Sequence, residues 1–300
     1  MSFADRAIRQ IRRLGHPLCV GLDPHLDLIP EVFRRGSMKP NDPATIAAVE
    51  EMLLLVLERV GGLVPVVKPQ IAFFERLGGR GIAALERLCE KARQLGLLVL
   101  LDAKRGDIGS TAEAYAQAYF GYDAPLPVDA LTVNPYLGLD SLEPFVKAAK
   151  AADGGLFVLV KTSNPGAADF QGREASGEPL FARVAAALTA EAEAWRGEEG
   201  WSSLGVVVGA TQATDAPRVR EKLPHSLFLV PGYGAQGAGA KEAAAGFVPG
   251  PTGRREGGLV NSSRGLVFAP ALAGAATAAA WEKTFDQLLD RAIGELAAVV

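Results

Sequence analysis

The sequence predicts an α/β protein in which eight parallel strands close into one (β/α)8 TIM barrel. Short apolar runs rich in valine and leucine alternate with longer segments of helical periodicity, and each kind of segment occurs eight times. The apolar runs are nearly continuous, which is typical of strands buried on both faces. Eight such strands alternating with eight helices favour closure into a barrel.

The predicted strands are bounded mainly by glycine, proline or charged residues and cover residues 17–23, 64–70, 97–104, 130–135, 155–163, 204–210, 226–232 and 258–264. The predicted helices cover residues 44–60, 81–95, 110–120, 141–151, 179–195, 214–222, 239–246 and 275–297. In the second helix Ile82, Leu85 and Leu88 share a face, and Gly96 ends it. An open doubly wound sheet is the main alternative, although no G-x-G-x-x-G sequence follows the first strand.

The length and composition suit one barrel domain that spans residues 1–300, since 49% of the residues are hydrophobic. The formal net charge is −3 without a basic stripe, which argues against nucleic acid as a partner. No apolar run is long enough for a membrane span, and no apolar signal segment opens the chain. Cys19 and Cys89, free or paired, are too few for a disulfide scaffold, so we expect a reduced, cytoplasmic protein.

Two connecting segments, residues 164–178 and 247–257, exceed ordinary loop length and are rich in glycine, proline and charge. Long loops of this kind are either functional or disordered. The first follows the fifth strand on the side where barrel enzymes bind substrates, so we expect it to cover a substrate. The second lies on the opposite side and is expected to be an ordinary connection.

Charged residues stand at the carboxyl ends of the first three predicted strands, where a barrel enzyme places its chemistry. Asp23 ends the first strand and Lys68 lies near the end of the second. Asp102 and Lys104 end the third and, being two residues apart, share one face. Asp107 lies beyond that strand and could reach a neighbouring subunit. Carboxylates keep such a lysine protonated, so the group is either a positioned proton donor or an ordinary buried salt-bridge network.

A glycine-rich turn follows the seventh strand and indicates a phosphate site. Gly232, Gly234 and Gly237 allow backbone N–H groups to approach a ligand closely. Gln236 adds an amide donor, and Arg264, after the eighth strand, adds a guanidinium suited to forked phosphate contacts. Barrels frequently bind phosphate between these two loops. A plain tight turn remains the alternative.

The three histidines do not indicate a metal centre. His16, His25 and His225 are scattered and show no paired ligand spacing. His25 follows Asp23 closely and could border the site, but we expect it to be a solvated loop residue. We therefore predict no metal.

The segments at the strand ends resemble orotidine 5′-phosphate decarboxylases, in particular the longer bacterial form, type 2. Six segments in the family's order carry the resemblance: VGLDP at 20–24, VKPQ at 67–70, LDAKRGDIGST at 101–111, KTSNP at 161–165, PGYGAQG at 231–237 and NSSR at 261–264. The sequence departs from the pattern at Gly166, where the longer form often carries serine; this position flanks a loop and has no assigned role.

The resemblance implies decarboxylation of orotidine 5′-monophosphate (OMP) to uridine 5′-monophosphate (UMP), the last step of de novo pyrimidine biosynthesis, without metal or cofactor. Lys68, Asp102, Lys104 and Asp107 would form a charged tetrad in which Lys104 protonates the C6 carbanion. Asp107 would come from the partner subunit of a homodimer.

The remaining implied site residues bind the substrate. Asp23 would bind the ribose with Lys68 and with Thr111 of the partner subunit. Ser163 would meet the pyrimidine edge, and Gln236 and Arg264 would hold the phosphate. The implied substrate-binding set is completed by Pro231 and Ser263.

Two other functions remain open. A metal-dependent sugar-phosphate decarboxylase or aldolase can share D-x-K-x-x-D, but Lys68 would repel its metal ion. The second open function is a non-catalytic barrel that binds a nucleotide as a sensor or scaffold. Loss of a tetrad residue would favour it, but all four residues are present.

Overall fold

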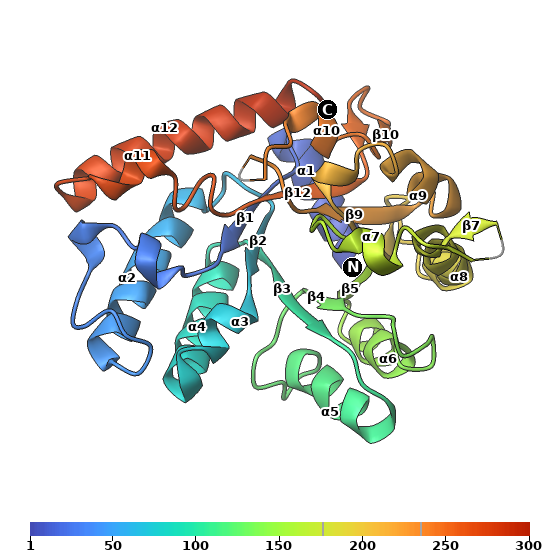
Figure 1. The fold of residues 1–300 in the computed structure, drawn as a ribbon, viewed down its shortest axis with the longest axis horizontal. Coiled ribbons are helices and arrows are strands. Elements are labelled where there is room, and N and C mark those ends of the chain that lie inside the picture. The colour runs from blue at the N-terminus through green and yellow to red at the C-terminus, as the bar shows by residue number, and fades with distance from the viewer. Residues whose placement is uncertain (176, 235) are drawn as a thin grey trace.

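The computed structural model describes residues 1–175, 177–234 and 236–300 and contains a closed barrel of parallel strands surrounded by helices (Figure 1). Around the barrel, the strands follow the order β1 (Leu18–Leu22), β12 (Gly258–Ser262), β9 (Ser226–Val230), β8 (Ser202–Val208), β5 (Gly155–Lys161), β4 (Ala130–Val133), β3 (Leu98–Arg105) and β2 (Val66–Pro69). β2 pairs in turn with β1, and each of these strands overlaps one predicted strand. The predicted (β/α)8 barrel is therefore confirmed.

Helices overlap all eight predicted helical segments: α2 (Pro43–Val60), α4 (Gly78–Gln94), α5 (Gly109–Tyr119), α6 (Glu143–Ala151), α8 (Leu180–Ala194), α9 (Ala216–Lys222), α10 (Ala240–Ala243) and α12 (Ala278–Ala297). Further helices that the sequence analysis did not anticipate are α1 (Phe3–Leu14), α3 (Ile71–Glu75), α7 (Ala167–Phe170) and α11 (Pro270–Ala273). Most of these extra helices are a single turn, too short for a periodic pattern to reveal.

The two long connections contain regular structure. Residues 164–178 include α7 and a small antiparallel pair, β6 (Glu174–Ala175) and β7 (Glu178–Pro179). Residues 247–257 include a second pair, β10 (Val248–Pro249) and β11 (Arg255–Glu256). Two positions in the predicted functional loops, Ser176 and Ala235, lie outside the described residues.

Helix α1 closes the amino-terminal pole of the barrel. Phe3 packs edge-on against Phe157 of β5, with ring centroids 5.9 Å apart, and Ala4 N donates to Ser203 Oγ of β8. Phe3, Ala4 and Phe157 belong to a buried apolar cluster that also contains Leu227 and Leu259 of the barrel strands. This apolar cluster fills the amino-terminal half of the barrel. A charged catalytic group would be costly to bury there, so such groups are expected at the carboxyl ends of the strands.

Candidate active site

A lysine–aspartate cluster occupies the carboxyl ends of β1, β2 and β3. Lys68 Nζ lies 3.0 Å from Asp102 Oδ2, and Lys104 Nζ lies 2.5 Å from Asp102 Oδ1. Asp23 Oδ1 lies 3.9 Å from Lys68 Nζ. Four of the residues predicted from the strand ends therefore come together in one chain. Each oxygen of the Asp102 carboxylate has a lysine ammonium as its partner.

Burial and charge act in opposite directions on the pKa values of this cluster. Burial alone would raise the pKa of Asp102, but attraction to Lys68 and Lys104 outweighs it and holds that pKa well below its usual range. Burial alone would lower the pKa of Lys68, but Asp102 and Asp23 outweigh it, so the net shift is upward. Both members of the buried Lys68–Asp102 pair are therefore charged at neutral pH.

The lowered pKa of Asp102 predicts a specific pH dependence of stability. An unfolded aspartate has a pKa of about 3.9, so the ion pairs of Asp102 stabilise the fold above that pH, and this contribution is lost as the pH falls toward the lower folded-state pKa. We expect the melting temperature of the wild type to fall more between about pH 5 and about pH 3 than that of Asp102→Asn, which has no carboxylate to protonate. Thermal melts followed by circular dichroism would measure both slopes, and equal slopes would contradict the lowered pKa.

Lys104 reaches the cluster through an irregular piece of β3. The pairing register of β3 with β4 shifts between Leu101 and Arg105, and Lys104 has a left-handed backbone with φ +48°. The prediction that regular alternation puts Asp102 and Lys104 on one face does not describe this irregular segment, but the two side chains do meet, since Lys104 Nζ donates to Asp102 Oδ1. Thr132 of β4, which the sequence analysis missed, contacts this irregular segment through its hydroxyl.

Asp107 follows the carboxyl end of β3, and Thr111 lies in the first turn of α5. Asp107 is half-buried and accepts a hydrogen bond from the N–H of Ile108, while Thr111 is exposed. No ion pair or hydrogen bond within the described chain joins either residue to the lysine–aspartate cluster. Within one chain, these two predicted site residues therefore remain apart from the other members.

The loops after β5 and β9 bring the predicted pyrimidine residue Ser163 close to the predicted phosphate residue Gln236. Gly232 has φ +100°, and a Cβ placed on it would lie 3.1 Å from Gln236 Oε1 and 3.5 Å from Ser163 Cβ. Pro231 precedes this glycine and is half-buried. Arg264 is exposed, and no ion pair of its guanidinium is found within the described residues.

Three buried oxygen atoms at the same pole have no hydrogen-bond partner in the described part of the chain: Asp23 Oδ1, Asn261 Oδ1 and Ser263 Oγ. Ser263 lies against β1, since a Cβ on Gly21 would come within 2.6 Å of its Cβ. Unpartnered buried polar atoms are rare in folded proteins, so their gathering at one pole favours a polar ligand there. Asn261 belongs to the NSSR segment, but the sequence analysis gave it no role.

The glycine-rich turn is attached to the last helix. Tyr233 is buried and its hydroxyl donates to Glu295 Oε2 of α12 at 2.7 Å, while Arg291 Nε donates to Glu295 Oε1 at 2.8 Å. Burial and this hydrogen bond raise the pKa of Tyr233. Tyr233 therefore stays protonated and ties the turn to the C-terminal helix.

His25 differs from its prediction as a solvated loop residue. Its ring is half-buried between Phe73 and Phe268, with centroid distances of 4.4 and 5.7 Å. Burial lowers its pKa. The physical reason is that α3, after β2, and the loop after β12 each bring a phenylalanine ring against the loop after β1, which the separate sequence segments do not reveal.

Both cysteines are buried and free, and burial raises the pKa of Cys19 to about 12. Cys19 is accordingly a small core residue of β1 and a poor nucleophile. Among the described residues, no group of three or more histidine, cysteine, aspartate or glutamate side chains is arranged to hold a metal ion. No described helix is both long and apolar enough to cross a membrane.

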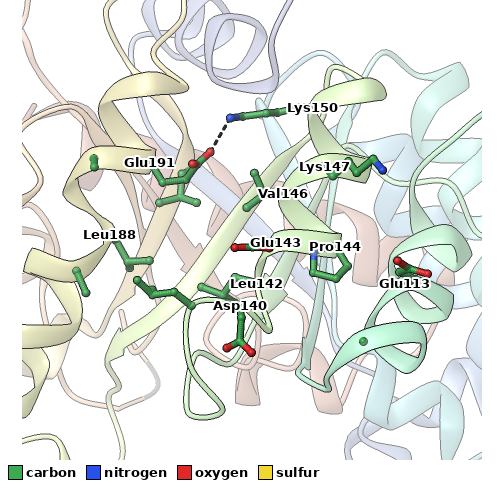
Figure 2. A pocket seen from close by; sticks show the side chains of 15 residues that line it. Glu113, Asp140, Leu142, Glu143, Pro144, Val146, Lys147, Lys150, Leu188 and Glu191 are labelled. Atoms are coloured by element: carbon green, nitrogen blue, oxygen red, sulfur yellow. Dashed lines mark hydrogen bonds and ion pairs between the residues drawn. The ribbon is translucent and has the colours of Figure 1, made fainter.

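A large hollow of about 1030 Å³ lies away from the strand ends, on the outer wall between α6 and α8 (Figure 2). Lys150 of α6 and Glu191 of α8 face each other across it and form an ion pair of 2.6 Å. None of the predicted site residues lines this groove. We therefore place the candidate active site at the mouth of the barrel, where the charged groups meet.

Barrel enzymes carry their chemistry at the carboxyl ends of the strands, and this pole holds the buried lysine–aspartate cluster, so fold and site together define an enzyme of the (β/α)8-barrel class. Comparison with known proteins identifies the family within this class. The chain belongs to the orotidine 5′-phosphate decarboxylase / HUMPS family, whose model matches residues 16–279.

Relatives of known name cover most of the chain. It is 43% identical over 273 residues to an orotidine 5′-phosphate decarboxylase of Rhodopirellula baltica, covering 90% of this chain and 89% of the relative. It is 44% identical over 264 residues to one of Deinococcus radiodurans, covering 88% of each. The solved structure of Leishmania donovani OMP decarboxylase superposes with a TM-score of 0.73 at 32% identity, covering 100% of each chain. The protein is accordingly a carboxy-lyase of bacterial type.

Proposed function

We propose that this protein converts OMP to UMP and carbon dioxide, the last step of de novo pyrimidine biosynthesis, without a metal or cofactor. The observation that carries the proposal is the pair of lysines held on the two oxygens of Asp102 at the barrel mouth. This arrangement fixes a protonated amine beside a carboxylate that cannot easily be neutralised. Residues 1–300 would form one domain, since Trp281 and Phe285 of α12 are buried in the same core as the barrel strands.

The proposed chemistry needs no electron-accepting group. The C6–carboxylate bond of OMP breaks, its electron pair stays on C6, and carbon dioxide leaves. The Lys104 ammonium stabilises this carbanion and then transfers a proton to C6, after which solvent reprotonates the amine. Asp102 would face the departing carboxylate, and repulsion between the two would raise the energy of the bound substrate.

The other predicted residues would hold the substrate from the ribose to the phosphate. Asp23 would bind the ribose hydroxyls together with Lys68, and Ser163 would meet the pyrimidine. Gln236 and Arg264 would hold the phosphate. Pro231 and Ser263, beside this turn and beside β1, would complete the walls. Asp23 Oδ1 and Ser263 Oγ have no hydrogen-bond partner in the described chain, and this supports the assignment because the hydroxyl groups of a nucleotide would supply one.

A homodimer would complete each site with Asp107 and Thr111 of the partner subunit. Two observations support it: neither residue reaches the cluster of its own chain, and apolar side chains are exposed beside them. Ile108 is 59% exposed, and Tyr136 and Leu137 of the neighbouring loop are also exposed. Exposed apolar patches of this kind mark interaction surfaces in many soluble proteins.

The dimer predicts recovery of activity when two inactive variants are mixed. Hybrid dimers of Asp107→Ala and Lys104→Ala would contain one intact site, because one chain supplies the lysine and the other the aspartate. After subunit exchange of equal amounts, we expect about a quarter of the wild-type activity, as random pairing of two chains gives. Mixing Lys68→Ala with Lys104→Ala is the matched control and should recover nothing, since both residues lie in one chain's cluster. Equal results for the two mixtures would refute the shared site.

The test of the reaction follows the loss of ultraviolet absorbance of OMP with purified protein, with and without EDTA. Turnover that resists the chelator is the expected result. Turnover that EDTA abolishes would instead indicate a metal-dependent enzyme. UMP binding without turnover would favour a nucleotide-binding barrel, and neither binding nor turnover would refute the substrate.

A further inference from the structure

Thr132 is a buried polar residue in an otherwise apolar strand, and the proposed mechanism gives it no role. Its side chain is fully buried in β4 between Leu131 and Val133. The hydroxyl accepts from the N–H of Ala103 at 2.9 Å and from the N–H of Lys104 at 2.8 Å, and it donates to Asp102 Oδ1 at 3.0 Å. A hydroxyl has one donor and two acceptor sites, and all three are occupied here by residues of β3.

These contacts lie where β3 departs from regular pairing. Register with β4 is lost between Leu101 and Arg105, and the N–H groups of two successive residues meet one side-chain oxygen in place of strand carbonyls. Lys104 has φ +48° there, a conformation that residues with a Cβ rarely adopt. The Thr132 hydroxyl is therefore the group that satisfies the backbone of the irregular segment.

The same hydroxyl also reaches the partner of the Lys104 ammonium. Asp102 Oδ1 accepts hydrogen bonds from Lys104 Nζ at 2.5 Å and from Thr132 Oγ1. The Lys104 side chain is 43% exposed, so packing does little to fix it. Its position depends on its backbone and on the carboxylate that it contacts, and Thr132 holds both.

We propose that Thr132 is a positioning residue for Lys104: its hydroxyl fixes the left-handed turn of β3 and orients Asp102, so that the ammonium is aimed at the reacting carbon. This inference rests on the proposed function, in which Lys104 delivers the proton. A hydroxyl that only satisfied the irregular strand would influence stability and leave turnover unchanged.

The test compares variants at Thr132 by OMP turnover well below their melting temperatures. Thr132→Val keeps the shape and removes the hydroxyl; we expect kcat to fall about 100-fold, the effect of a misplacement of about 1 Å. KM should change less than about threefold, because ground-state binding does not need an aimed ammonium. Thr132→Ser keeps the hydroxyl and should restore kcat to within about threefold of the wild type.

Thr45→Val is the matched control. Thr45 is fully buried in α2, and its hydroxyl has no hydrogen-bond partner in the described chain, so the same substitution there should leave kcat unchanged. Should Thr132→Val fail to fold, Thr132→Cys fills similar space with a weak acceptor and should show the loss instead. In a crystal structure of whichever variant folds, φ of Lys104 should no longer be near +48°.

The outcomes separate this inference from the proposed function. Suppose that the wild type turns over OMP. The positioning role alone would then be overturned if Thr132→Val kept the wild-type kcat, or if kcat fell equally in the serine and valine variants. A rise in KM at unchanged kcat would also overturn it. Wild type without any turnover of OMP would overturn the proposed function and the positioning role together.

Discussion

Lys104→Ala is expected to lower kcat/KM for OMP by about 10⁴-fold, or about 5.4 kcal/mol of transition-state stabilisation. The substitution removes an ammonium that is bound to Asp102 and partly exposed, while Lys68 stays buried against the other carboxylate oxygen. Lys68 cannot replace it because its side chain is only 4% exposed, against 43% for Lys104, so its ammonium is not open to the mouth. Steady-state decarboxylation measured by absorbance gives the ratio directly.

The control for this variant is Lys147→Ala, which removes an exposed lysine of α6 on the outer groove and should leave turnover unchanged. Binding of UMP to Lys104→Ala should persist, because the proposed phosphate and ribose contacts remain. A loss of less than about tenfold, or about 1.4 kcal/mol, would mean that another group protonates the carbanion.

Arg264→Ala is expected to lower kcat/KM for OMP by about 10³-fold, although its guanidinium takes no part in the chemistry. Binding energy from a distant phosphate can be used to stabilise the transition state. Removing the guanidinium that binds the phosphate therefore lowers kcat as well as the affinity for OMP. Arg264 is exposed just after β12, the strand next to β9 in the barrel, and a guanidinium there can form a forked contact with phosphate oxygens. The lysine–aspartate cluster is not touched by the substitution.

Orotidine, which lacks the phosphate, provides the sharpest control for Arg264. The wild type and Arg264→Ala should decarboxylate orotidine at the same slow rate, since neither can use a phosphate contact. Arg80→Ala removes another exposed arginine, on α4, and should behave as wild type with both substrates. A loss for OMP below about tenfold, about 1.4 kcal/mol, would contradict the phosphate role.

The sequence alone was sufficient to predict the barrel because each buried strand is a local apolar run. The charged ends of those runs then predicted which residues would meet, and Asp23, Lys68, Asp102 and Lys104 do meet. Closure brings strand ends to one pole whatever the details of the loops. Site residues that end a strand could therefore be predicted from the sequence.

Features that depend on a partner far along the chain were not accessible in the same way. The irregular turn of β3 depends on the Thr132 hydroxyl from β4, and alternation within β3 alone cannot reveal it. The one available signal was a lone threonine in an apolar strand, which must find a hydrogen-bond partner if buried. Likewise, α1 is a plug only because Phe3 meets Phe157, which is 154 positions away in the sequence.

The left-handed backbone of Lys104 has a consequence for how this protein would respond to selection. A residue with a Cβ costs about 1 kcal/mol in that conformation, whereas glycine bears no such penalty and asparagine a smaller one. A laboratory screen that rewarded only heat resistance would therefore enrich glycine or asparagine at position 104. The selected variants would be more thermally stable but would lack the proposed proton donor. Thermal stability alone is therefore a poor criterion for selecting improved variants of this protein.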